Sequence, residues 1–420
     1  MRNKKAFVAV IVVLILSSVV FAGGKSERNV ATTVRIYQQK IEIHDALVAA
    51  AEAFNASHEG IVVEVETGGD DYVTILKGQF AAGNGATIFQ SNGYNDMAVF
   101  RDYLTDLSGE DWVKYMTDIA IETASLDGTV FGFPFTTECT AIVYRNDVFK
   151  KLGLSVPKTR SEYFALCETL KNNGYPKGPM SDGFNSWYQA GMFTFSTALA
   201  RQENPLAFIE GLNNGTETMI GNKKFIELAT WVQEEFKYSQ DPLGVDFNAQ
   251  TSAFTSGRAP LVIGGSWLQP TIDDVDPNMD VGMFSYPFTE DPVENDYLYS
   301  YVGPIWHINS RAGKDEIAAA KEFINWLVYD ETGNHFLTAE MKAIPGIINV
   351  TPDINAIGKL GGILYEYMRN GQTKGTYNAL YPQGTGGAIL FGDAVCALAA
   401  GKYSVDEFIA EAQRIWDSTK

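Results

Sequence analysis

The chain alternates between two hydrophobic periods, and this alternation limits its fold more than any other feature of the sequence. Runs typical of short strands cover residues 34–37, 61–65 and 86–90, and a helical stripe of apolar side chains lies between each run and the next. Strands and helices in this order predict a largely parallel sheet with helices on both faces. Ligands of such α/β sheets bind at the carboxyl ends of the strands, so we expect a site in the loops after Tyr37 and Phe89.

A second α/β block begins near Phe131. Thr159 and Glu162 have the spacing of a capping box, and Asn146 has the position of an N-cap for a helix that Gly153 ends. The strands predicted here cover residues 131–134, 141–144, 259–263 and 301–308, and the helices cover 147–152, 160–173, 225–236, 247–255, 315–329 and 405–416. A chain of 420 residues is expected to form two or three domains or one large one, and two such blocks agree with the first of these.

The first 22 residues have the pattern of a secretory signal peptide. A basic start (residues 2–5) precedes an apolar run over residues 6–16, and small residues before Gly23 fit a cleavage site. A membrane anchor is the alternative, but the run is shorter than the roughly 20 residues that a spanning helix needs. We therefore expect export, cleavage after Ala22 and a soluble periplasmic product, with no nearby cysteine to accept a lipid.

The charge balance and the missing motifs argue against several classes of function. The chain has 51 Asp and Glu against 32 Lys and Arg, a net charge of -19, which argues against binding to nucleic acid or to an anionic membrane, since both need a basic surface. It contains none of the glycine-rich, nucleophile or zinc motifs of common enzymes. Its four histidines are scattered without ligand spacing. We therefore expect no metal site, no cofactor and no catalysis.

The cysteines do not form the framework of a small secreted domain. Cys139, Cys167 and Cys396 are too few and too far apart for that role, so a hydrophobic core must hold the fold. One bridge between Cys139 and Cys167, or three separate thiols, both remain open at this point.

The tryptophans divide into expected core residues and candidate site residues. Trp187 and Trp267 each follow small or polar residues in an apparent loop or strand end, where an indole face can stack on a sugar ring. Trp306 lies in an apolar strand and fits either role. The tryptophans in helical patterns, which we expect in the core, are Trp231, Trp326 and Trp416.

The segment VFGFPFTTECTAIVYRNDVF, residues 130–149, strongly resembles the hinge-crossing segment of bacterial extracellular solute-binding proteins of the sugar-binding type, the group that includes maltose-binding proteins. Other segments resemble the same family in the same order: TILKGQFAAGNGATIF at 74–89, FTSGRAPLVIGGSWL at 254–268 and INSRAGKDEIAAAKEFINWLV at 308–328. The resemblance covers nearly all of the chain after the signal peptide.

The resemblance implies an α/β fold of two lobes, the type II periplasmic-binding-protein fold, with a multi-strand hinge and a ligand cleft between the lobes. Residues 30–135 and 303–345 would form lobe 1, and residues 136–302 and 346–420 would form lobe 2. It also implies a monomer that closes on a carbohydrate and delivers it to the permease subunits of an ABC importer.

The resemblance and the position of residues along the chain together give ten candidate ligand residues in this sequence. Glu138 matches a sugar-binding carboxylate, and Trp267 matches a stacking ring. The other expected ligand residues are Gln39 and Glu42 in the first loop, Gln90 and Asn92 in the second, and Asp71, Trp187, Ser266 and Tyr377. The second loop reads QSNGYND and lacks the charged pair of the maltose binders, which argues against maltose itself.

Other functions of the same sequence remain as alternatives. The scaffold can carry a ferric ion, with Tyr299, Tyr301 or Tyr365 as ligands, or a cationic polyamine. A secreted glycoside hydrolase would use two carboxylates, here Glu42 and Glu138, at separations of roughly 5 to 9.5 Å.

Overall fold

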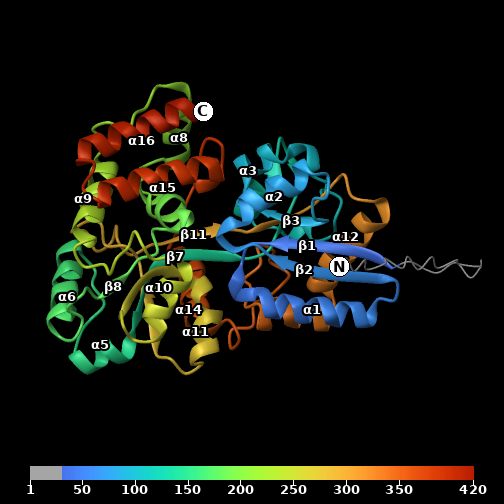
Figure 1. Cartoon of the computed structure of the whole chain (residues 1–420), viewed down its shortest axis with the longest axis horizontal. Helices are drawn as coiled ribbons and strands as arrows, with labels where there is room; N and C mark the ends of the chain where they lie inside the picture. The colour runs from blue at the N-terminus through green and yellow to red at the C-terminus, as the bar shows by residue number, and fades with distance from the viewer. Residues whose placement is uncertain (1–30) are drawn as a thin grey trace, which may run out of the picture.

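Two separate β-sheets organise the computed structural model, which describes residues 31–420 (Figure 1). The first sheet has the strand order β2-β1-β3-β12-β6, and the second has the order β13-β11-β7-β9-β8 with β10 also paired to β7. The predicted signal peptide and its cleavage site lie outside the described residues. Among residues 31–420 no helix is both long enough and apolar enough to cross a membrane.

The first sheet contains the alternation predicted from the sequence. Its parallel strands are β1 (Thr32–Gln38), β2 (Ile61–Thr67) and β3 (Ile88–Ser91). From later in the chain, β12 (Ile305–Ile308) pairs antiparallel with β3 on one side and with β6 (Phe133–Pro134) on the other. Helices α1 (His44–Ser57) and α12 (Lys314–Tyr329) share one hydrophobic core with this sheet. Helices α2 (Tyr72–Ala81) and α3 (Tyr94–Val99) pack in a separate, smaller hydrophobic core.

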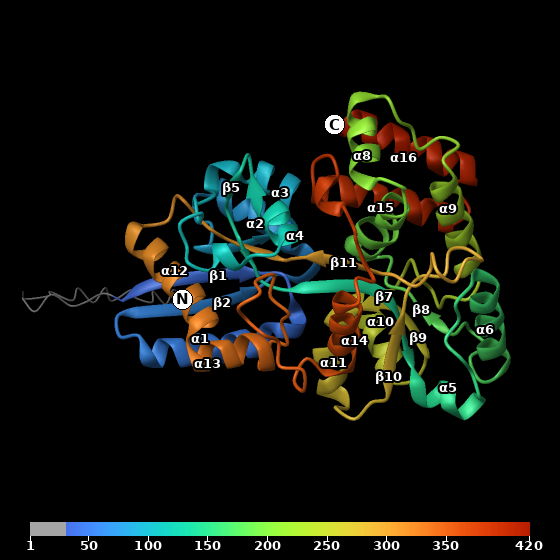
Figure 2. The same cartoon turned by 180° about the vertical axis from the view of Figure 1, so that it is seen from behind.

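The second sheet is built around the long strand β7 (Thr137–Arg145). It pairs antiparallel with β9 (Leu261–Gly265), β10 (Val281–Phe284) and β11 (Leu298–Val302). The short strands β8 (Met180–Ser181) and β13 (Thr373–Gly375) lie at the two edges, and β4 (Ser125–Leu126) and β5 (Thr129–Val130) form a separate hairpin. Figure 2 shows β7 and β11 running from the part of the molecule built around the second sheet toward the part built around the first sheet, where the two parts join.

The remaining helices mostly cover the second sheet. They are α4 (Asp118–Ala124), α5 (Asn146–Leu152), α6 (Arg160–Asn172), α7 (Ser196–Ala200), α8 (Pro205–Asn214), α9 (Lys223–Glu235), α10 (Phe247–Thr255), α11 (Gln269–Val275), α13 (Glu331–His335), α14 (Gly358–Arg369), α15 (Thr385–Ala399) and α16 (Val405–Thr419). Of these, α4 and α13 belong to the part of the molecule built around the first sheet, and the others belong to the part built around the second (Figures 1 and 2).

Two details of the predicted elements were wrong. The single strand expected over 301–308 is broken at Gly303-Pro304, and its halves β11 and β12 pair in different sheets. Pro304 has no N–H to donate to a sheet, which favours a change of partner there. Asn146 is the first residue of α5 rather than its N-cap, and its side-chain amide donates to Asp280 at 3.1 Å. The capping box of Thr159 and Glu162 is confirmed.

The chain passes from one sheet to the other between β6 and β7 and again between β11 and β12. Every strand of the first sheet falls within residues 30–135 and 303–345, and every strand of the second falls within 136–302 and 346–420. We propose on this ground that the two lobes have those limits.

The three cysteines are free thiols, so the bridge between Cys139 and Cys167 is not formed. Burial raises the pKa of Cys139 to about 12, so this thiol stays protonated at neutral pH. Trp306 is fully buried and stacks on Phe135 with ring centroids 4.7 Å apart, which places it in the core.

Two carboxyl groups, Asp182 and Glu235, are adjacent and fully buried in the second lobe. Burial raises the pKa of Asp182 to about 6, and burial and the charge of Asp182 raise that of Glu235 well above its usual value. Both pKa values are raised in the folded state, so the folded protein binds protons more tightly than the unfolded chain. The free energy of unfolding is therefore highest below about pH 4 and falls as the pH rises through 6 and beyond.

We therefore expect Asp182→Asn, which removes one of the buried charges, to raise the melting temperature at pH 8 by several degrees and to change it little at pH 4. Glu203→Gln, at an exposed position of the same lobe, serves as control. Melting curves at the two pH values would contradict this account if Asp182→Asn gave the same shift at both.

Candidate ligand-binding site

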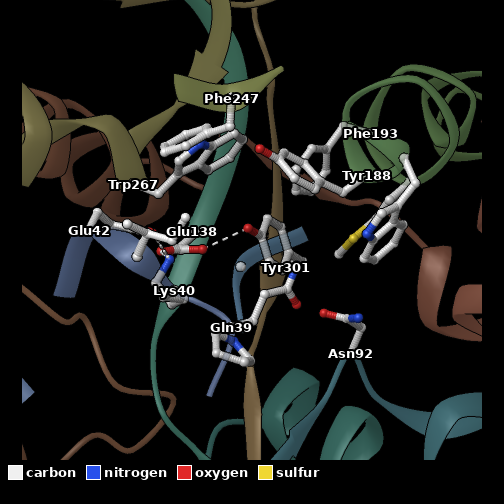
Figure 3. A pocket seen from close by; sticks show the side chains of 15 residues that line it. Gln39, Lys40, Glu42, Asn92, Glu138, Tyr188, Phe193, Phe247, Trp267 and Tyr301 are labelled. Carbon is white, nitrogen blue, oxygen red and sulfur yellow. Dashed lines mark hydrogen bonds and ion pairs between the residues drawn. The ribbon is translucent and has the colours of Figure 1, made fainter. Parts of the chain in front are cut away.

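A cavity of about 90 Å³ lies between the two lobes, next to the carboxyl ends of β1 and β3 (Figure 3). The first lobe contributes the loop after β1 and Asn92, and the second contributes β7, β11 and helical segments. The lining residues are Gln39, Lys40, Ile41, Glu42, Gly69, Asn92, Glu138, Trp187, Tyr188, Met192, Phe193, Phe247, Trp267, Tyr301 and Pro304. The loops after Tyr37 and Phe89 thus reach the cavity, as the α/β pattern predicts.

Six aromatic rings form most of the wall on the side of the second lobe. The ring of Trp267 stacks on that of Phe193, with centroids 4.8 Å apart and planes inclined by 22°. The ring centroids of Phe193 and Tyr301 are 5.2 Å apart. Trp267 can lie flat here because residue 265 is glycine, since a Cβ there would be 2.2 Å from the indole. Trp187 stands edge-on to Tyr188 and keeps part of its surface exposed.

Several wall residues come from a π-helical segment, Tyr188–Thr194, that directly precedes α7. This segment packs closely on α15, because a Cβ at Gly191 would lie 1.8 Å from the carbonyl oxygen of Ala388. The wider turn of a π-helix is frequent at functional sites. It places Tyr188, Met192 and Phe193 at the cavity.

The polar end of the cavity is a network around Lys40. The Lys40 ammonium lies 2.5 Å from Glu42 Oε1 and 2.7 Å from Glu138 Oε1, and the Tyr301 hydroxyl donates to Glu138 Oε2 at 2.7 Å. These contacts join the two lobes, since Lys40 follows β1 whereas Glu138 and Tyr301 lie on β7 and β11.

Burial and charge act in opposite directions in this network. Burial lowers the pKa of Lys40, but the attraction of Glu138 and Glu42 outweighs it, and the pKa is raised. Burial raises the pKa of Glu138 in spite of Lys40, and it raises that of Tyr301. Lys40 is therefore a firmly held cation that holds both carboxylates in place.

Six of the ten predicted site residues line the cavity: Gln39, Glu42, Asn92, Glu138, Trp187 and Trp267. Asp71, Gln90, Ser266 and Tyr377 do not. The side chain of Gln90 is buried, and its amide oxygen accepts from the Gln39 backbone N–H at 2.9 Å. The hydroxyl of Ser266 accepts from the Cys139 backbone at 3.3 Å, on the far side of Trp267.

The other two positions lie at 3₁₀ turns and are not among the residues that line the cavity. Asp71 ends a 3₁₀ turn, Gly69–Asp71, of which Gly69 lines the cavity. Tyr377 precedes another such turn, Asn378–Leu380, with a left-handed φ of 57°. The lining residues that were not predicted from the sequence include Lys40, Tyr188, Phe193 and Phe247. Tyr301 was considered only as an iron ligand. For Lys40 a signal existed, since it lies between Gln39 and Glu42.

The geometry gives little support to the alternatives. Of the three tyrosines considered for iron, only Tyr301 lines the cavity, while Tyr299 is buried in the core beside Tyr286. The two carboxylates of a hydrolase would need to flank the bond that is cleaved. Here the Lys40 ammonium contacts both Glu42 and Glu138 at that place. Within residues 31–420 no group of three or more His, Cys, Asp or Glu side chains is arranged to hold a metal ion.

Comparison with known proteins shows the family to which the chain belongs. The family model described as "bacterial extracellular solute-binding protein" matches residues 49–359. The multiple sugar-binding protein of Streptococcus mutans is 22% identical over 264 residues, which span 61% of this chain and 62% of that protein. The melibiose/raffinose/stachyose-binding protein MelE of Bacillus subtilis is 21% identical over 352 residues, 80% of this chain and 78% of MelE.

Solved structures share the whole fold at low sequence identity. A sugar transporter of Bacillus licheniformis in complex with stachyose superimposes with a TM-score of 0.74 at 18% identity, covering 92% of this chain and 100% of that one. The binding protein RafE in complex with raffinose gives 0.75 at 18% identity, with 92% and 99% covered. The predicted two-lobed α/β fold class is thereby confirmed.

Proposed function

The chain belongs to the bacterial extracellular solute-binding proteins, and we propose that it captures a carbohydrate between its two lobes and delivers it to the permease of an ABC importer. The names of two relatives support a sugar as the solute: one is a multiple sugar-binding protein, and the other, MelE, is named as binding melibiose, raffinose and stachyose. Export to the periplasm and action as a monomer belong to the same proposal, which rests on the family and on the pattern of residues 1–22.

One observation carries the choice of ligand: an aromatic wall faces amide and carboxylate groups across a single cavity. A sugar ring has C–H faces that pack on an indole and hydroxyls that bond to amides and carboxylates at its edge. Gln39, Glu42 and Asn92 project from the first lobe, whereas Trp187 and Trp267 belong to the second. A ring bound between them would be held by both lobes.

The charges favour a neutral sugar. Among the described residues that line the cavity, Lys40 is the single cation, and it is already paired with Glu42 and Glu138. An acidic sugar would place a further negative charge beside these carboxylates with no free cation to balance it. We therefore propose an uncharged mono- or oligosaccharide.

A thermal-shift screen tests this function. Protein freed of any copurified sugar is melted with melibiose, raffinose, stachyose, simple hexoses, glucuronate, ferric ion and spermidine. A solute at 100 times its dissociation constant stabilises by about 2.7 kcal/mol, so a neutral sugar should raise the melting temperature by several degrees. A shift with ferric ion or spermidine and with no sugar would contradict the proposal.

Trp187→Ala is expected to weaken binding of the selected sugar about tenfold, because it removes part of the apolar wall. Since Trp187 is only half-buried, the melting temperature without sugar should change little. Trp187→Phe, which keeps an aromatic face, is the matched control and should retain most of the affinity. Titration calorimetry of both variants checks this, and equal affinities of Trp187→Ala and the wild type would remove Trp187 from the site.

A further inference from the structure

Beside the cavity, α3 of the first lobe meets the start of α15 of the second. Asp96 on α3 accepts two hydrogen bonds from Thr385, one from its backbone N–H at 2.6 Å and one from its hydroxyl at 2.6 Å. The neighbouring Asn95 donates its side-chain amide to the carbonyl of Tyr381. Asp96 and Thr385 are 8% and 4% exposed, so this contact between the lobes is buried.

The first N–H groups of a helix lack partners within the helix, and an acidic side chain is favourable there. In most helices the preceding residue supplies this cap. Here the preceding residue is Gly384, which has no side chain, and Asp96 supplies the cap from the other lobe. This cap therefore exists only when the two lobes are together.

Glycines make the close approach possible on both sides. Gly384 has a φ of 55°, and a Cβ there would lie 2.2 Å from the Asp96 carboxylate. On the first lobe, Gly93 has a φ of 110°, and a Cβ there would lie 2.9 Å from the Cβ of Ala379. A side chain at either position would hold the lobes apart.

The contact between Asp96 and Thr385 is linked to the ligand cavity through Asn92. Asn92 lines the cavity, and its side-chain amide donates to Asp96 at 3.3 Å and to the Thr385 hydroxyl at 3.2 Å. Its backbone N–H donates to Asp96 as well, at 3.2 Å. A solute that bonds to Asn92 therefore contacts a residue whose position depends on the cap.

We infer that Asp96 is an interlobe closing residue: its cap on α15 forms on closure and stabilises the closed state. The part that concerns the solute rests on the function proposed above. Apparent affinity equals the intrinsic affinity multiplied by the population of the binding-competent state. Loss of a buried charged hydrogen-bond partner should lower the population of the closed state and weaken sugar binding about tenfold or more.

Small-angle scattering without sugar and titration with the sugar of largest thermal shift test this inference. Asp96→Ala removes the cap, and Gly384→Ala blocks the approach of Asp96. Gly371→Ala is the control for Gly384→Ala, because Gly371 has a similar φ of 68° with open space around it. Asp118→Asn, at an exposed acidic residue in the first turn of α4, is the control for Asp96→Ala.

We expect both test variants to have a larger radius of gyration without sugar, an affinity at least tenfold lower, or both, while the two controls match the wild type. Test variants equal to the wild type in both measurements would overturn the inference. If no sugar binds any form, the proposed function fails, and the radius of gyration without sugar alone decides the role of Asp96: an increase supports it and equality overturns it.

Discussion

Lys40→Met is expected to weaken sugar binding at least a hundredfold. The substitution removes the cation that contacts both Glu42 and Glu138 and leaves two carboxylates in the closed cavity without a counter-charge. Removing one partner of a buried ion pair costs about 3 to 5 kcal/mol, and each 1.4 kcal/mol changes affinity tenfold. Because Lys40 and Glu138 lie on different lobes, opening of the cleft returns the carboxylates to water. The cost should therefore fall on the closed state and not on the folding of the lobes.

A second substitution makes this prediction specific. Lys40→Met combined with Glu138→Gln should bind more tightly than Lys40→Met alone, because one unpaired charge is gone. Lys151→Met, at an exposed position of α5, should have no effect. Titration calorimetry of the wild type, the two single variants and the double variant tests this prediction. If Lys40→Met binds the sugar like the wild type, the network around Lys40 has no part in closure or binding.

Trp267→Ala is expected to lower both sugar affinity and the stability of the sugar-free protein. The ring lines the cavity, but it is only 7% exposed and stacks on Phe193, so it belongs to the core of the second lobe as well. Replacing a buried Trp by Ala costs about 3 to 5 kcal/mol of unfolding free energy. Loss of the wall should also weaken binding by about tenfold or more.

Trp267→Phe separates the two effects, since it fills part of the space and keeps an aromatic face. Melting curves without sugar and calorimetric titrations should show an intermediate loss of stability and of affinity. Unchanged affinity in Trp267→Ala, together with lowered stability, would restrict this ring to the core. Comparison with Trp187→Ala is informative because Trp187 is half-buried and should affect binding alone.

The regular parts of the fold could be predicted because the spacing of apolar residues along the sequence indicates which face of a helix or strand is buried. The apolar stripe on α1 is buried on one face and the run of β1 is mostly buried, and both elements lie where the sequence predicts them. The π-helical segment Tyr188–Thr194 has no such signal, since it is buried almost all round. For this reason Phe193 and Tyr188 could not be assigned to the site from the sequence.

The loop residues show a second limit. Gln90 and Asn92 are two positions apart in the same predicted ligand loop, but only Asn92 lines the cavity. Gln90 is still part of β3, and its side chain is fixed by the backbone of Gln39 in the loop after β1. Contacts between segments far apart in the chain decide which way such side chains turn. The same is true of Asp96, whose partner Thr385 is 289 residues away.

Titration calorimetry of the wild-type protein with the sugar selected in the screen tests the central claim most directly. We expect saturable binding of one neutral sugar per chain, with a negative change in heat capacity because the aromatic wall is removed from water. Absence of saturable heat with every sugar of the screen, in protein freed of copurified solute, would contradict the claim that the cleft between the lobes is a carbohydrate site.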